Sequence, residues 1–162
     1  MIKKKISKSL FIIIFIFFFT INNSKSYEEI KILYKIDDKI ITNLDIVHEY
    51  NYLISLNNDL GNLKKSESFK IAKNSLIREK IKVNELNKFV DIESFNDKNL
   101  IDKIIKNFYS KLNLDDIQSF EVYLNKFDIS LSEVRQKIKI EILWNQLVVN
   151  KFKDQINIDV SE

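Results

Sequence analysis

The segment after Ser130 constrains the fold more than any other part of this sequence, because its apolar residues cover more than one face of a helix. They are Val134, Ile138, Ile140, Ile142, Leu143, Trp144, Leu147, Val148 and Val149. A helix that is apolar on several sides cannot lie half in water, so we expect it to run through the middle of the domain. Ser130 and Glu133 form a capping-box pattern that predicts where this helix begins. We expect Trp144 to be a core residue, because its neighbours one turn away are apolar.

Four further stretches have apolar residues at helical spacing. The first is Ile46–Ile54, which follows a capping box at Thr42–Asp45 and ends at Asn57–Asn62. The second is the longer Ser66–Val90, and the third is Leu100–Leu112, after Asp97. The fourth is a short stretch that begins at Asp115 and Asp116 and carries Phe120, Tyr123 and Phe127. The sequence contains no proline and one glycine, so asparagine, aspartate and serine must form the turns.

Two parts of the sequence have the period of two that strands show. Residues 30–41 place Asp37-Asp38 where a tight turn belongs and predict a β-hairpin, and residues 156–160 predict a short strand. Because a two-stranded hairpin alone is marginally stable, we expect it to pack on the helices. The predicted fold class is therefore mainly α, a small helical domain with an N-terminal β-hairpin and a short C-terminal strand.

The N-terminus has the pattern of an export signal. Four lysines among the first eight residues precede the apolar run Leu10–Ile21, and Ser24 and Ser26 suit cleavage before Tyr27. The run is shorter than the roughly 20 residues that a membrane-spanning helix needs. We therefore expect a signal peptide over residues 1–26, a mature domain over residues 27–162 that does not span the membrane, and a periplasmic location. An uncleaved inner-membrane anchor and a buried core helix are the alternatives.

The charge of the mature domain argues against nucleic acid as its partner. The whole chain has a formal net charge of +3, but five of its 26 basic residues lie before Tyr27, where no acidic residue occurs. The remaining 21 basic residues face 23 acidic ones, so the basic surface that drives nucleic-acid binding is missing. The absence of cysteine excludes disulfides, thiolate nucleophiles and thiol-based zinc sites.

The residue patterns also predict no catalytic residues, no cofactor and no metal. His48 is the only histidine, and one histidine on a helix without a partner motif is typical of a surface residue. The pairs Asp37-Asp38 and Asp115-Asp116 could bind a divalent cation, but turn and helix-start chemistry explains both more simply. A single glycine excludes a glycine-rich phosphate loop.

The order of the predicted elements resembles the N-terminal domain of SurA-type periplasmic chaperones over residues 30–162. The resemblance rests on KIDDKIIT at Lys35–Thr42, on LIRE at Leu76–Glu79, and on FD at Phe127-Asp128 followed by SEVR at Ser132–Arg135. It implies an ATP-independent chaperone domain that binds unfolded outer-membrane proteins. Many members of the family also carry parvulin-type prolyl isomerase domains, whose site one histidine without cysteine cannot form.

The sequence leaves three functional interpretations. The first is a holdase that binds unfolded outer-membrane proteins through apolar and aromatic surface. The second is a structural or assembly subunit that docks one fixed partner, and the third is the truncated N-terminal part of a parvulin-type isomerase. The candidate client-binding residues are Phe120, Tyr123, Tyr50, Phe108 and Tyr109, of which we expect Phe120 and Tyr123 to be the most exposed. An exposed apolar groove would favour the holdase.

Overall fold

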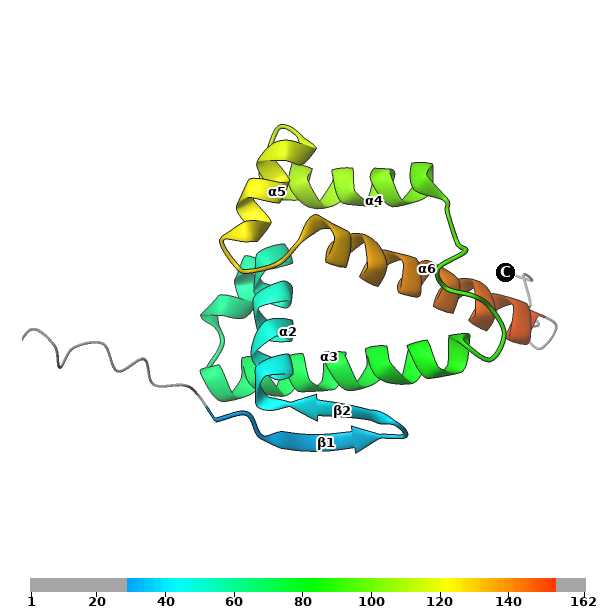
Figure 1. Cartoon of the computed structure of the whole chain (residues 1–162). Helices are drawn as coiled ribbons and strands as arrows, with labels where there is room; N and C mark the ends of the chain where they lie inside the picture. The colour runs from blue at the N-terminus through cyan, green and yellow to red at the C-terminus, as the bar shows by residue number, and fades with distance from the viewer. Residues whose placement is uncertain (1–28, 154–162) are drawn as a thin grey trace, which may run out of the picture.

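The computed structural model describes residues 29–153 of the chain (Figure 1). A hairpin of β1 (Ile32–Ile36) and β2 (Lys39–Thr42) is followed by α2 (Asn43–Leu56), the 3₁₀ helix η2 (Asn58–Asn62), α3 (Lys65–Leu86), α4 (Lys98–Lys111), α5 (Ile117–Asn125) and α6 (Leu131–Phe152). The predicted mainly α domain with an N-terminal β-hairpin is confirmed. The predicted signal peptide and the strand predicted at residues 156–160 lie outside the described residues.

The starts of α2, α4 and α5 follow from capping residues that the sequence identifies. Thr42 and Asp45 form both halves of the predicted capping box at the start of α2. Asp97 and Asp116 each accept a backbone N–H from the first turn of α4 and α5, respectively. These side chains satisfy backbone donors that have no partner within the helix, which is why the helices begin at these points.

The start of α6 follows the sequence only in part. The Ser130 hydroxyl accepts the backbone N–H of Glu133, as a capping box requires. The Glu133 carboxylate, however, lies 2.9 Å from Nε2 of His48 on α2. His48 is exposed, as expected, and its contact with Glu133 ties the start of α6 to α2.

Three separate apolar clusters hold the helices together. The first joins α4, α5 and the first half of α6 through the buried residues Ile101, Ile105, Phe120, Leu124, Ile129, Val134 and Ile138. The second joins the hairpin to α2 and α3 through Ile41, Ile46, Ala72 and Leu76. The third joins the end of α3 to the middle of α6 through Leu86, Ile92, Ile140 and Leu143. We call α4, α5 and the first cluster the α4–α5 lobe.

The helix α6 runs through the middle of the domain, as its composition predicts. Figure 1 shows it between α4 on one side and α3 on the other. Val134 and Ile138 near its start belong to the α4–α5 lobe, and Ile140 and Leu143 at its middle belong to the cluster with α3. A helix that is apolar on several sides is thus covered from two directions.

Two expectations about individual residues are wrong. Trp144 is only partly buried, because Leu143 occupies the inward position of α6 and the indole lies at the cluster edge, where Lys82 Nζ is 5.9 Å from its ring centre. The helix predicted over Ser66–Val90 ends at Leu86 as α3, and the exposed Phe89 and Val90 lie in the turn and the loop that follow it.

The hairpin packs on α2 and α3 through one face. Ile41 of β2 is fully buried in the second cluster. Asp37 in the turn accepts a hydrogen bond from Asn84 Nδ2 of α3 at 2.9 Å, and Lys73 Nζ of α3 lies 5.4 Å from the Tyr34 ring centre. Asp37 has a positive φ of 52°, a conformation that aspartate adopts more readily than most residues. These contacts fix the hairpin along the length of α3.

Candidate functional site

The predicted client-binding residue Phe120 is not on the surface. Its exposed fraction is 0%, so the expectation that this ring is exposed is wrong. The short helix α5 is amphipathic, and Phe120 and Leu124 lie one turn apart on the face that packs against α4 and α6. The Tyr109 ring of α4 lies 6.3 Å from the Phe120 ring, centre to centre. Phe120 is therefore the centre of the α4–α5 lobe.

The other four predicted aromatic residues are partly buried and divide between two clusters. Tyr123, Phe108 and Tyr109 pack against the α4–α5 lobe. Tyr50 packs in the hairpin's cluster, with its ring stacked 5.2 Å from that of Phe69. These rings thus pack over core residues, and the five predicted client-binding residues do not form one common surface.

The largest group of exposed apolar side chains close together in the chain lies on the hairpin and just before it. It comprises Ile30, Ile32, Leu33, Tyr34 and Ile40, which we call the hairpin surface. Ile32 is 65% exposed and Ile40 is 51% exposed, although both are residues that normally favour burial. Exposed apolar surface of this kind is typical of sites that bind other proteins.

The hairpin surface arises because two strands are too few to cover each other. In the sheet formed by the described residues β1 and β2 are the only strands, and the face of Ile36 and Ile41 packs on α2 and α3. Tyr34, the partner of Ile41, lies at the exposed border of this packed face, whereas Ile40 pairs with Lys35 on the opposite face. A bulge between Ile32 and Tyr34 places Leu33 as an extra residue in β1, which interrupts simple alternation. Sequence patterning predicted the strands but gave no sign that their second face lacks a covering layer.

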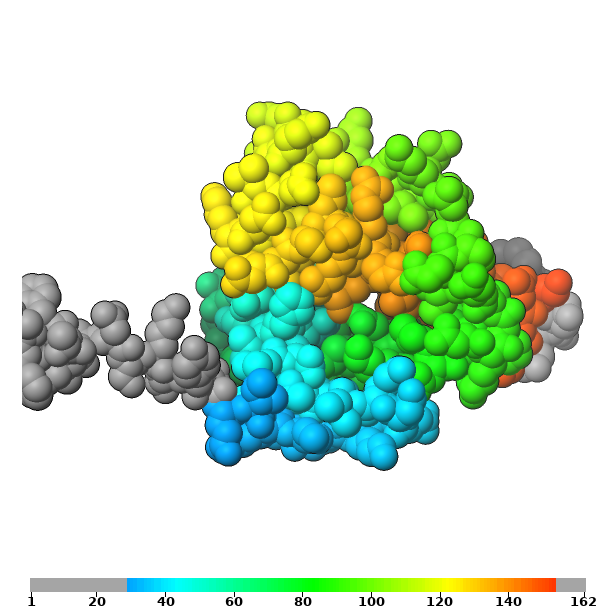
Figure 2. All heavy atoms as spheres, in the orientation of Figure 1, coloured from blue at the N-terminus to red at the C-terminus, as the bar shows by residue number. Residues whose placement is uncertain are grey.

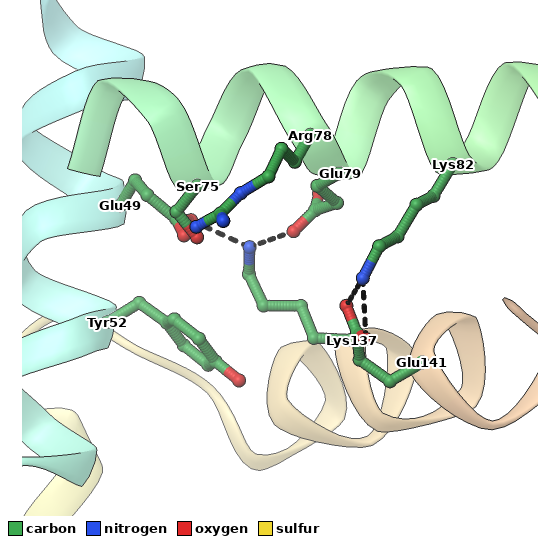
Figure 3. A pocket seen from close by; sticks show the side chains of 8 residues that line it. All are labelled: Glu49, Tyr52, Ser75, Arg78, Glu79, Lys82, Lys137 and Glu141. Atoms are coloured by element: carbon green, nitrogen blue, oxygen red, sulfur yellow. Dashed lines mark hydrogen bonds and ion pairs between the residues drawn. The ribbon is translucent and has the colours of Figure 1, made fainter. Parts of the chain in front are cut away.

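A second feature is a charged pocket in the middle of the domain (Figure 3). The pocket has a volume of about 180 Å³ and is lined by Glu49, Tyr52, Ser75, Arg78, Glu79, Lys82, Lys137 and Glu141. We call it the central pocket. Figure 2 shows an opening at this level between α6 and α3. The three apolar clusters therefore surround a polar centre.

Lys137 of α6 organises the central pocket. Its Nζ atom lies 2.7 Å from Oε2 of Glu49 on α2, also contacts the carboxylate of Glu79 on α3, and lies 4.6 Å from the centre of the Tyr52 ring. Glu49 is almost fully buried at 3% exposure, so its charge requires this partner. One ammonium group thus joins three helices.

Burial and charge shift the pKa values of two groups in the central pocket. Burial lowers the pKa of Lys137, but the carboxylates of Glu79 and Glu49 raise it by more, so it lies above its ordinary value. Burial, followed by repulsion from the same carboxylates, raises the pKa of the Tyr52 phenol. At neutral pH the pocket therefore holds a charged lysine and a neutral tyrosine.

A second pair in the central pocket joins α3 to α6 in the same way. Lys82 Nζ lies 2.6 Å from both carboxylate oxygens of Glu141. The pocket lining holds three cationic side chains, Arg78, Lys82 and Lys137, and three carboxylates, Glu49, Glu79 and Glu141, so its formal charges balance. The arrangement connects helices, and within residues 29–153 no group of three or more metal-ligating side chains lies together.

The comparisons with known proteins add no relative. No protein-family model matches this chain, and no curated protein and no solved structure matches it either. In the part of the chain that the structure describes, none of the helices combines the length and apolar composition of a membrane span.

Proposed function

We propose that this chain is an exported, ATP-independent chaperone of the periplasm that holds unfolded outer-membrane proteins through the hairpin surface. The observation that carries the proposal is the exposure of five large apolar side chains on the hairpin. The resemblance of residues 30–162 to SurA-type chaperones and the export signal expected at residues 1–26 support it.

Holding without ATP requires contacts that form and break readily. Apolar contact is non-directional and depends mainly on the area removed from water, so it suits clients of varied sequence. The hairpin surface offers such contact, whereas the central pocket is lined mainly by charged groups that already pair with one another. The proposed activity therefore belongs to the hairpin and involves no chemical step.

Light scattering of a diluted, denatured outer-membrane barrel protein tests the proposal. We expect the protein to suppress aggregation at a severalfold excess without nucleotide, and to give no rate increase in a proline-peptide isomerisation assay. Unchanged aggregation would contradict the holdase and favour the alternative, a subunit that docks one fixed partner. Catalysis in the isomerase assay would contradict the proposed absence of chemistry.

A double variant, Ile32→Ser with Ile40→Ser, locates the activity within the molecule. We expect it to lose most of the suppression, because it removes two of the most exposed apolar side chains of the hairpin surface. The matched control is Val122→Ser on α5, which is 63% exposed but lies on the α4–α5 lobe. Equal losses in both variants would contradict a role for the hairpin surface in particular.

A further inference from the structure

The two edges of the hairpin differ in how much backbone they leave for a partner. At the end of β2 the Thr42 backbone N–H donates to Asp45 Oδ2, so the capping box closes this edge. β1 has β2 as its one partner in the sheet of the described residues. The outer edge of β1 is therefore the longer stretch of available backbone.

The register identifies which backbone groups of the hairpin point outward. Opposite residues of an antiparallel pair alternate between exchanging hydrogen bonds and directing their N–H and C=O groups away. Ile36 and Lys39 flank the two-residue turn, so they form a bonded pair. The next pair, Lys35 and Ile40, consequently directs its backbone groups outward. Lys35 thus presents a donor and an acceptor on the β1 edge.

The charge beside the β1 edge is positive. Lys31 and Lys39 are paired with Glu29 and Asp38, whereas residues 29–153 show no carboxylate within ion-pair distance of Lys35. Lys73 of α3 lies over the Tyr34 ring on the other side of the same strand. An added strand would therefore meet the ammonium group of Lys35, which makes no ion pair within residues 29–153.

Resting on the proposed function, we propose that the outer edge of β1 takes up an extended client segment as a third strand, and that this segment alternates apolar with acidic residues. Successive side chains of an added strand point to opposite faces. A residue opposite Lys35 shares the face of Lys35 and Ile40, where its carboxylate can pair with the Lys35 ammonium group, and its neighbours lie on the face of Tyr34 and Ile36, where apolar side chains are favoured. Strand addition of this kind gains affinity from main-chain bonds and selectivity from alternate side chains.

This occupant fits the edge better than a second copy of the chain does. In a two-fold antiparallel pairing centred on Lys35, the two lysines would lie directly opposite each other, and like charges in that position are destabilising. Edge lysines commonly prevent such self-pairing. Strands of outer-membrane barrels alternate apolar with polar residues, so they provide segments of the required pattern.

Fluorescence anisotropy with three labelled peptides tests the inference on the purified protein. The first alternates valine with glutamate, the second alternates valine with lysine, and the third is the glutamate peptide with every second backbone nitrogen methylated. We expect the lysine peptide to bind about fivefold more weakly than the glutamate peptide. The methylated peptide should bind at least about tenfold more weakly, because methylation removes ladder donors.

Two charge-reversal variants sharpen the test. Lys35→Glu should reverse the preference between the two unmodified peptides, whereas Lys106→Glu should leave it unchanged, because Lys106 is exposed on α4, on the opposite side of the domain from the hairpin (Figure 1). A preference that survives Lys35→Glu would overturn the inference, as would dimerisation of the protein through this edge.

The outcomes also separate this inference from the proposed function. Equal binding of the methylated peptide, in a protein that still suppresses aggregation, would overturn strand addition and leave apolar holding intact. Failure of all three peptides together with failure to suppress aggregation would overturn both.

Discussion

The α4–α5 lobe contains seven buried residues, including Phe120, that pack against one another. In the hairpin, by contrast, Ile41 alone is fully buried, and the five apolar side chains of the hairpin surface are exposed. Both regions have apolar residues at the spacing of their secondary structure. They differ in how much of the apolar surface is covered, because α4 and α6 bury the face of α5 that carries Phe120 and Leu124, whereas α2 and α3 leave most of the apolar side chains of the hairpin exposed. Whether an apolar side chain is exposed therefore depends on which other elements pack over it, and the spacing of residues in the sequence does not show this.

The largest expected effect lies in the lobe. Phe120→Ala should lower the free energy of unfolding by about 3–5 kcal/mol, through lost burial and the cavity left behind. Urea titration measures the change, with Val122→Ala as the control, because this exposed neighbour on α5 should change stability by no more than about 0.5 kcal/mol. A loss below about 1 kcal/mol for Phe120→Ala would mean that the ring is not the centre of the lobe.

The central pocket joins α2 and α3, on which the hairpin packs, to α6, and breaking it should have the next largest effect. Lys137→Met leaves the buried Glu49 and the nearby Glu79 without their cation, which should cost roughly 3 kcal/mol. Lys82→Met is the matched control, since its partner Glu141 is largely exposed and the pair should contribute less than about 1 kcal/mol. Equal losses would show that burial of Glu49 does not distinguish the two lysines.

The pH dependence of stability should report the partly buried Tyr52. Burial raises its pKa in the folded state, so above about pH 10 the unfolded chain loses the phenol proton first. The unfolded state then binds fewer protons than the folded one, and the free energy of unfolding falls as pH rises. Urea titrations from pH 9 upward should show a shallower fall in Tyr52→Phe than in the unaltered protein. Identical slopes would contradict burial of the phenol.

The smallest effect on stability is expected in the hairpin. Ile32→Ser removes a side chain that is mostly in water already, so the free energy of unfolding should change by no more than about 0.5 kcal/mol. Urea titration of this variant should overlay that of the unaltered protein. A loss above about 1 kcal/mol would indicate that Ile32 stabilises the fold, and it would remove the contrast with the lobe.

Much of the fold could be predicted from local chemistry. The caps at Thr42, Asp97 and Asp116 mark helix starts because a side-chain oxygen must satisfy a backbone donor nearby in sequence. The central position of α6 follows from its wide apolar surface. The end of α3 at Leu86 was missed because Phe89 and Val90 continue the apolar pattern beyond the last helical turn.

The candidate site could be predicted far less well, since it depends on contacts between distant segments. The exposure predicted for Phe120 was wrong, because α4 and α6 cover the face of α5 that its spacing makes apolar. The ion pairs of Lys137 with Glu49 and Glu79 join residues from three helices. In the sequence, each of these charged residues looks like an ordinary surface residue of its own helix. The hairpin surface was missed because the alternation of apolar and polar residues predicts that a strand has a buried face, but it does not predict whether another element covers the second face.

Site-specific photo-crosslinking tests the central claim most directly. A photoreactive amino acid placed at Ile32 in the hairpin or at Val122 in the lobe is equally accessible, since these side chains are 65% and 63% exposed. With an unfolded outer-membrane barrel protein, we expect crosslinks from position 32 and few from position 122. Equal yields from the two positions, or a higher yield from position 122, would contradict the claim that the hairpin holds the client.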